Sequence, residues 1–333
     1  MRARTRLITS LAFAVALTAA CGESGSSGTS GGGGGGGGTA ASGDACAPIP
    51  GDQLVVLEDD QNLQNADNII PAVNAETAQA NPALLPNLNQ VSAELTTDEL
   101  IEMNAAVEVQ RESAEDVAAA WVVENIDDGS LEQGSGAITV GGANFPESSI
   151  LANIYADVLQ KAGFDATVQE VGNRELYLQA LQAGDIDVFP EYLATVTETL
   201  EGDVATVVAS GDVEETVAAL EPLAAEAGLV FGEPSEAADQ NAFAVTQAFA
   251  DELGVSTLSE LAEACDDGSL ILGGPAECPE RPYCQPGLEE TYGLEFAEFR
   301  TLDTGGPLTR AAIERGEISL GLVFSSAGFL AEG

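Results

Sequence analysis

The chain has 333 residues, of which 55 are acidic, 10 are Lys or Arg and none is His, so its formal net charge is −45. Because phosphate backbones and anionic lipid surfaces repel such a charge, nucleic acid and negatively charged membranes are poor partners. The lack of His excludes catalysis and metal binding that depend on imidazole.

The first residues have the pattern of a secretory signal. Three arginines precede an apolar run over 7–20, which is too short to cross a bilayer comfortably. The run ends in Ala-Ala-Cys, which resembles a bacterial lipobox, so 1–21 is predicted to be a lipoprotein signal. Cys21 would then carry the lipid that anchors the protein to the outer face of the cell membrane. The alternative is an ordinary signal peptide whose cleavage leaves a soluble secreted protein.

Residues 22–45 have a composition of their own. They are rich in Gly and Ser and nearly free of apolar side chains, so this segment cannot bury enough surface to fold. It is predicted to be a disordered leash between the lipid anchor and a folded body. The body, 46–333, is long enough for two domains with separate cores.

Four cysteines follow the lipobox: Cys46, Cys265, Cys278 and Cys284. An exported location permits disulfides. Cys278 and Cys284 bracket a short Pro-rich loop, so we predict that they pair with each other. A bond between Cys46 and Cys265 would complete the set, but spacing alone does not establish the connectivity.

The first part of the body contains one strand and two helices. The run 54–60 (LVVLEDD) predicts a buried strand that ends in solvated acids, and 61–92 is predicted to be mostly irregular. Thr96 and Glu99 have capping-box spacing ahead of an apolar-periodic helix, and a second helix starts near Ser113. Residues 126–136 are polar and Gly-rich, which predicts a linker.

Strand and helix alternate from residue 138 to Tyr192. The order is a strand, a polar turn, a helix over about 148–162, a strand, a helix over about 174–183 and a short strand that ends at Tyr192. Such alternation builds a mostly parallel sheet, which binds ligands at the carboxyl ends of its strands. The polar turns at those ends are therefore expected to line one crevice.

The second half of the body continues this alternation, so the fold class is α/β. It is predicted to contain helices over about 213–227, 247–253, 257–264 and 308–315, and strands near 228–231, 242–245, 269–273, 298–302 and 318–324.

The three polar turns carry a family resemblance. NFPE at 144–147, GNR at 172–174 and PEYLAT at 190–195 resemble the motifs of solute-binding proteins of ABC importers for glycine betaine, choline and related osmoprotectants. The resemblance implies a two-lobed fold of the type II periplasmic-binding-protein kind, with a mixed sheet in each lobe and a ligand cleft between the lobes. It also implies a solute-binding role, an ABC permease as partner, no cofactor and a monomer.

The order of the segments departs from that family. A strand like LVVLEDD and two helices like those of 97–125 end the family's chains, whereas they come first here. We therefore expect a circular permutation, in which 126–136 joins the ancestral ends. A fragment of a tandem array is the alternative. Lobe 1 is predicted to span 46–195, with 51–125 as its permuted segment followed by 137–195, and lobe 2 to span 196–333. Of the two crossings between lobes in the family, only the one near 192–197 would then stay covalent.

The resemblance implies a set of binding residues. Arg281 lies in the Pro-rich loop where the family holds a ligand carboxylate, and guanidinium suits that task; the alternative is a surface ion pair with Glu277 or Glu280. Tyr192 and Phe324 match two rings of an aromatic box for a quaternary ammonium. Their alternatives are hinge packing for Tyr192 and core packing for Phe324.

Polar side chains complete this predicted set. Asn144, Phe145 and Asn173 are expected on the lobe 1 side of the cleft, and Asn241 and Thr304 on the lobe 2 side. Glu147 is expected mainly to cap the helix that follows it.

Two of the family's box aromatics have no counterpart in the chain. Asn241 stands where one ring is usual, and 305–306 is Gly-Gly where another falls. The predicted ligand is therefore a zwitterionic or quaternary-amine solute, with another polar solute such as an amino acid or an ectoine-like compound as the alternative. A wall-associated interaction protein with a lost pocket is a further alternative, and an enzyme is not expected.

Overall fold

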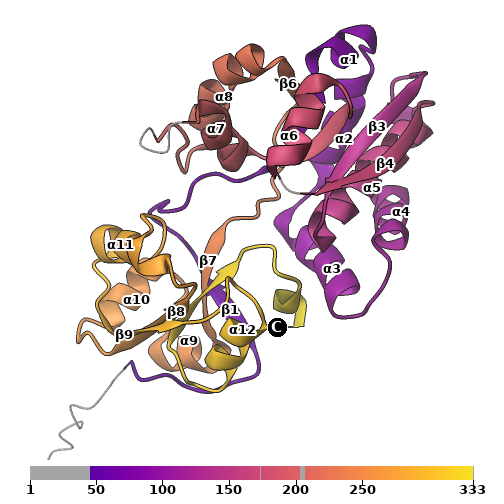
Figure 1. Cartoon of the computed structure of the whole chain (residues 1–333). Coiled ribbons are helices and arrows are strands. Elements are labelled where there is room, and N and C mark those ends of the chain that lie inside the picture. Colours follow the sequence, from indigo (N-terminus) through magenta and orange to yellow (C-terminus); the bar gives the residue numbers. More distant parts are fainter. Residues whose placement is uncertain (1–45, 173, 203–206, 333) are drawn as a thin grey trace, which may run out of the picture. The chain divides into compact units, whose positions relative to one another are not determined.

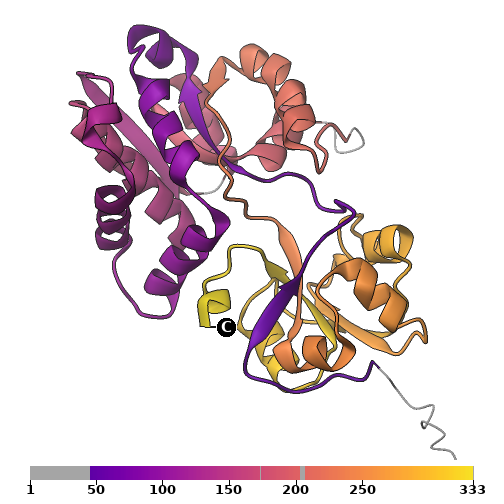
Figure 2. The ribbon, with the colours of Figure 1, turned by 180° about the vertical axis from the view of Figure 1, so that it is seen from behind.

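The computed structural model describes residues 46–172, 174–202 and 207–332. The predicted signal, Cys21, the Gly/Ser segment and Asn173 lie outside the described residues. The described chain contains two five-stranded sheets, each with helices packed against it (Figures 1 and 2). We call the two halves built on these sheets lobe 1 and lobe 2.

Lobe 1 is built on a mixed sheet with the strand order β4-β3-β5-β2-β6. The parallel pairs are β3 with β4 and β3 with β5, and β2 runs antiparallel to both β5 and β6. The strands are β2 (Ile69–Asn74), β3 (Ala137–Ala143), β4 (Asp165–Gly172), β5 (Val188–Tyr192) and β6 (Leu229–Phe231).

The helices of lobe 1 cover this sheet with apolar faces. In α5 the side chains of Ile150, Leu151, Ile154, Tyr155 and Val158 are fully buried, which makes this helix the centre of the largest core cluster. Thr96 and Glu99 form the predicted capping box at the start of α3. The helices are α1 (Ala75–Ala80), α2 (Leu84–Glu94), α3 (Thr97–Glu108), α4 (Ala114–Asn125), α5 (Pro146–Lys161), α6 (Arg174–Ala183), α7 (Leu193–Glu201) and α8 (Val213–Ala227).

Lobe 2 is built on a second mixed sheet with the strand order β1-β7-β10-β8-β9. Its strands are β1 (Leu54–Leu57), β7 (Asn241–Thr246), β8 (Leu270–Gly274), β9 (Phe296–Thr301) and β10 (Leu320–Phe324). Its helices are α9 (Gln247–Leu253), α10 (Leu258–Ala264), α11 (Gln285–Gly287) and α12 (Pro307–Glu314), with short turns η2 (Cys278–Glu280), η3 (Leu288–Tyr292) and η4 (Gly328–Glu332).

Two disulfides are buried in the core of lobe 2. Cys278 bonds to Cys284 across the Pro-rich loop, and Cys46 bonds to Cys265, 219 positions away in the sequence. The second bond ties the first described residues of the chain to the end of α10. Both pairs are the ones that the sequence analysis named.

The structure corrects the predicted boundary between the lobes. β1 lies in lobe 2, where Leu54 to Leu57 pair with Thr246 to Phe243 of β7, whereas α7, α8 and β6 lie in lobe 1 (Figure 1). The region 61–92, predicted to be mostly irregular, contains β2, α1 and most of α2. β2 is buried along its whole length between β5 and β6. Lobe 1 therefore comprises about 69–231, and lobe 2 is built from 46–57 together with 241–332.

Two segments cross between the lobes, at about 58–68 and 232–240, where one crossing had been predicted near Tyr192. They meet in an isolated antiparallel bridge between Asn68 and Ala238, and the Asp239 N–H donates to the Asp67 carbonyl oxygen at 3.2 Å. The two crossings therefore run side by side.

Asp59 lies at the start of the first crossing and was expected to be solvated. Its carboxylate instead accepts from the Leu63 N–H at 2.9 Å.

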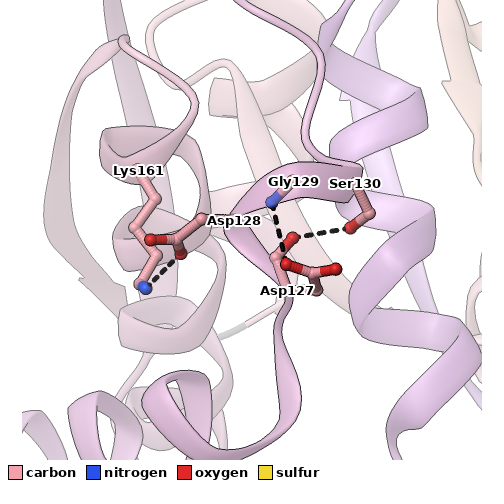
Figure 3. A network of polar contacts seen from close by, with 5 residues as sticks. All are labelled: Asp127, Asp128, Gly129, Ser130 and Lys161. Atoms are coloured by element: carbon pink, nitrogen blue, oxygen red, sulfur yellow. Dashed lines mark hydrogen bonds and ion pairs between the residues drawn. The ribbon is translucent and has the colours of Figure 1, made fainter.

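The predicted linker between α4 and β3 is ordered. The Asp127 carboxylate accepts from the Gly129 N–H at 2.9 Å in the short turn η1 (Asp128–Ser130), and the Asp127 carbonyl oxygen accepts from the Ser130 hydroxyl at 2.8 Å (Figure 3). Lys161 at the end of α5 pairs with Asp128 at 2.6 Å. The pair is exposed and adds little stability, but it fixes the path of the segment along α5.

Within the described part of the chain, we find no helix with both the length and the apolar character needed to cross a membrane.

Candidate functional site

Three adjoining hollows lie where residues of both lobes meet. Their volumes are about 600, 550 and 720 Å³, which is the range of small-molecule sites. Asp239 and Phe324 line all three, and Asp67 and Thr195 line two of them. Because the hollows share these walls, we call them together the crevice. It opens at the ends of β3, β5 and β10, the edge at which open α/β sheets bind ligands.

A buried hydrogen-bond network stands at the lobe 1 side of the crevice. The Tyr192 hydroxyl donates to Glu147 Oε1 at 2.6 Å, and Asn104 Nδ2 donates to Glu147 Oε2 at 2.6 Å. Asn104 Nδ2 also donates to the Ser326 carbonyl oxygen of lobe 2 at 2.9 Å. Burial, followed by the charge of Glu147, holds the pKa of Tyr192 well above its usual value. Tyr192 therefore stays a neutral donor that orients this carboxylate.

Aromatic rings form much of the remaining wall. Phe145 and Tyr192 have their ring centroids 6.4 Å apart at 31°, and Phe145 is 42% exposed. Tyr177 and Phe189 stack at 3.7 Å and 10° behind the same hollow. Phe324 ends β10 on the lobe 2 side. Tyr192, Tyr177 and Phe189 are buried, whereas Phe145 and Phe324 keep partly exposed faces. Exposed ring faces attract cations and the methyl groups of quaternary amines.

Carboxylates converge on the crevice from the two crossings. Asp67 accepts hydrogen bonds from the Thr195 N–H, at 2.9 Å, and from the Thr195 hydroxyl. Asp239 Oδ1 is buried and has no hydrogen-bond partner among the described residues. Burial, and then the negative charge of Glu147, raises the pKa of Asp239 to about 8, although hydrogen bonds from Ser326 act in the opposite direction.

Acidic side chains outnumber basic ones among the described residues that line the crevice. Among the described residues no group of three or more His, Cys, Asp or Glu side chains has the geometry of a metal site. Arg310 is the one basic residue of the described chain that lines the crevice, and it pairs with Glu314 at 2.7 Å and lies over the Phe329 ring. The crevice is therefore acidic and aromatic.

Comparison with known proteins identifies the family. A sequence model described as "Substrate binding domain of ABC-type glycine betaine transport system" matches residues 47–124 and 136–332. The chain belongs to this family. The interval between the two matched ranges comprises the last residue of α4 and nearly all of the segment that joins α4 to β3. Members of the family are transport components rather than enzymes, and the two mixed sheets are the two lobes of its periplasmic-binding-protein fold.

Two individual proteins are similar to parts of the chain. A glycine-betaine-binding protein of Pseudomonas aeruginosa is 27% identical over 183 residues, which is 50% of the chain and 56% of the relative. The chain thus spans about half the length of this curated relative. A solved structure described as "Crystal structure of glycine betaine/carnitine/choline ABC transporter" is 20% identical, with a TM-score of 0.44 over 59% of this chain and 70% of that chain.

Most of the predicted binding residues of this family line the crevice. Tyr192, Phe145 and Asn144 stand on its lobe 1 side, and Phe324 and Asn241 on its lobe 2 side. Asn173 lies outside the described residues, although its neighbour Gly172 is part of the wall. The polar turns that follow β3 and β5 therefore meet at one place, as their positions in the sequence suggested.

Two of the predicted residues do not line the crevice. The Arg281 side chain is 68% exposed and faces Glu277 at 3.9 Å, which is the surface ion pair considered as its alternative. Tyr283 of the same loop does line the crevice, because Gln64 Nε2 holds the Tyr283 carbonyl oxygen at 3.1 Å. Thr304 is exposed, next to a tight turn.

Glycine at that turn is a structural requirement. Gly305 has a φ of +67°, and a Cβ there would lie 3.1 Å from the Phe324 ring. A side chain would be strained by the backbone and would crowd the ring. Glycine at this position, where the resemblance led us to expect a box aromatic, therefore fits the way Phe324 is packed.

Two acidic residues of the site were not predicted as binding residues. Glu147 was expected mainly to cap α5, but its carboxylate accepts from Tyr192 and Asn104 instead. Asp67 was outside the predicted binding set because it lies in the first crossing, in a stretch with no periodic pattern. The sequence did contain one signal for Asp67, because acidic residues stand next to β2 and β7. Segments that cross between lobes lie beside the cleft, so their acidic side chains could have been predicted to face it.

Proposed function

We propose that this protein is the extracytoplasmic solute-binding lipoprotein of an ABC importer, and that it binds a small quaternary-amine or zwitterionic solute of the glycine betaine and choline class in the crevice. The supporting observation is the pairing there of aromatic rings with carboxylates. Each ring face contributes about 0.5–2 kcal/mol to holding a quaternary ammonium. Asp239 supplies a counter-charge on the lobe 2 side.

The two crossings act as the hinge between the lobes. Rotation about them moves lobe 1 against lobe 2, so the crevice opens to admit the solute and closes to exclude water. The closed monomer then docks on a membrane permease, and a partner ATPase supplies the energy. Lipidated Cys21 holds the protein beside that permease.

A thermal-shift screen of the full-length protein in detergent tests the binding role. We expect the melting temperature to rise with tetramethylammonium, choline or glycine betaine, since a ligand at a hundred times its Kd adds about 2.7 kcal/mol to the folded state. Phe324→Ala should abolish the shift. Arg281→Ala is the matched control and should keep it, because that guanidinium lies outside the crevice.

A different polar solute, such as an amino acid or an ectoine-like compound, is the second candidate. Asn241 and the turn at Gly305 favour it, since they replace two rings by polar or small groups. The same screen separates the candidates, because only the true class of solute raises the melting temperature. If no solute does so, the protein is a wall-associated interaction protein with a lost pocket, and the binding role is wrong.

The lipid anchor has a test of its own. We expect wild-type protein to be recovered with the membranes and its mature N-terminal peptide to carry the mass of a diacylglyceryl group on Cys21. Cys21→Ala should leave the protein unprocessed and without lipid. Recovery of unlipidated wild-type protein cut at another site would support an ordinary signal peptide instead.

We also propose that the chain is a circular permutant of its family. The order of its segments supports this, since β1 and the helices α3 and α4 precede β3 here and end the chain in the family. The family model meets the chain in two ranges that are separated at 125–135. The segment that joins the ranges would then be the newer connection.

A further inference from the structure

The two crossings bring two aspartates to the centre of the crevice. The Asp239 N–H donates to the Asp67 carbonyl oxygen at 3.2 Å, next to the bridge between Asn68 and Ala238. Both aspartates line the two smaller hollows, and Asp239 lines the third as well. A solute that reaches the space between the lobes therefore meets these carboxyl groups.

The two aspartates differ in their partners. Asp67 accepts from both the amide and the hydroxyl of Thr195. Asp239 has hydrogen bonds from Ser326, but its Oδ1 is buried with no partner among the described residues. An unpaired buried carboxylate oxygen is costly, so a cationic group or a proton is needed at this atom.

The charged groups around Asp239 are mostly acidic. Glu147 of α5 and Asp67 of the first crossing act on it directly, and Glu198 of α7 lines the same hollow. Tyr192 of β5 is neutral. Arg310 of α12 is the basic group facing the crevice, and its charge is shared with Glu314.

Glu108 of α3 adds to this acidic surround. Burial, followed by the charge of Glu147, raises its pKa. A neighbouring negative charge raises the pKa of a carboxyl group, so the group keeps its proton at a pH at which an isolated carboxyl group would release it. Burial, and then the negative charge of Glu147, raises the pKa of Asp239 to about 8, so the empty crevice carries a proton there at neutral pH.

We propose that Asp239 is a proton-exchange site, at which a solute with net positive charge displaces the proton on the carboxyl group and takes its place. The O–H bond of the carboxyl group breaks, the proton passes to solvent, and the carboxylate pairs with the cation. This inference rests on the proposed binding role of the crevice, and it specifies the charge of the solute and the pH dependence of its capture.

The exchange selects cations over zwitterions. A tetraalkylammonium ion gains the full attraction of Asp239 and Glu147, whereas the carboxylate of a zwitterion is repelled by the same groups. Below the pKa of Asp239 the cation must displace a proton, so the affinity for the cation should fall about tenfold for each unit by which the pH is lowered. Above that pKa the affinity should be constant.

Titration calorimetry of the full-length protein in detergent tests the exchange. Tetramethylammonium and choline are titrated at pH 7 in two buffers with different ionisation enthalpies, which gives the number of protons released. We expect most of one proton per cation, and an affinity about tenfold weaker at pH 6 than at pH 7. Asp239→Asn should release no proton and lose the pH dependence, whereas the exposed control Glu277→Gln should keep both.

The possible outcomes distinguish a failure of the proton exchange from a failure of the proposed binding role. If the cations bind with equal affinity from pH 5 to pH 9 and release no proton, the exchange is wrong and the binding role stands. If neither probe binds, the quaternary-amine role is wrong, and the exchange with it. Carbon-13 NMR titration of the aspartate carboxyl groups without solute is independent of binding. A resonance that is lost in Asp239→Asn should titrate near pH 8, and titration below about pH 5 would contradict the proposal.

Discussion

The hydroxyl of Tyr192 has a structural role that is separable from that of its ring. It is one of the two donors to the buried Glu147 carboxylate. Tyr192→Phe keeps the ring and removes the donor, so the free energy of unfolding should fall by about 1–3 kcal/mol, as measured by urea denaturation. Binding of a quaternary amine should survive in Tyr192→Phe and be lost in Tyr192→Ala.

Tyr283→Phe is the matched control for this prediction. Tyr283 also lines the crevice, but its hydroxyl makes no hydrogen bond to the part of the chain that the structure describes. Equal stability of the two Phe variants would mean that the network around Glu147 contributes nothing.

Asp239 should make the stability of the empty protein depend on pH. Its pKa is about 8 in the folded chain and has its usual value near 4 in the unfolded chain. The folded state therefore holds the proton more tightly, and this stabilisation is present at pH 4 and lost as pH rises to 8. Asp239→Asn should remove the loss, so its urea midpoint should fall less between pH 5 and pH 8 than that of the wild type. Identical slopes would contradict the raised pKa.

Single residues show where inference from motifs worked. Tyr192 is the last residue of β5 and Phe145 lies two residues after β3, so the strands position them and the motif locates them. Arg281 lies in a loop whose path depends on a disulfide and on Gln64 from the first crossing, and neither contact follows from the motif. Asp239 has no motif at all, because its chemistry comes from neighbours that are distant in sequence.

At the level of elements, the two disulfides should differ in strength. The Cys46–Cys265 bond closes a loop of 219 positions, and the Cys278–Cys284 bond closes one of 6. By chain entropy the first contributes about 5 kcal/mol and the second about 2 kcal/mol. The double variant Cys46→Ser with Cys265→Ser should therefore have the lower urea midpoint. If the Cys278 and Cys284 double variant is the less stable one, the Pro-rich loop matters more than its length suggests.

β2 was not predicted from the sequence because it contains a proline. Proline normally excludes a segment from the interior of a sheet, and Pro71 stands in the middle of this strand. In the structure Pro71 faces Pro190 of β5, so both strands lack an N–H at the same place. Helices and strands with strong periodicity, such as α5 and α8, were predicted close to their observed bounds.

For the whole molecule, the sequence predicted two sheets but not their membership. β1 is four residues long, and its pairing with β7 joins segments about 190 positions apart. The pattern of apolar residues indicates that a segment is a strand. Which strand it pairs with depends on which sheet has an open edge, and the pattern does not show this. That choice of partner moved the lobe boundary and replaced one predicted crossing by two.

The permutation predicts that the chain can be opened at another place. No strand pair of either sheet lies within 126–136, and the ion pair between Asp128 and Lys161 is exposed. We expect a chain that starts at residue 135, runs to 332 and continues through about a dozen Gly/Ser residues into 46–134 to keep both sheets and both disulfides. A linker of that length has a mean end-to-end distance of about 20 Å.

Folding and binding of the reopened chain measure the outcome. Its circular dichroism spectrum should match that of the parent, and the solute that raises the parent's melting temperature should raise its own by a similar amount. Opening the chain inside α5, which is buried in the lobe 1 core, is the control and should prevent folding. A reopened chain that fails to fold would mean that the segment between α4 and β3 is an integral part of lobe 1, and the permutation would lose its physical basis.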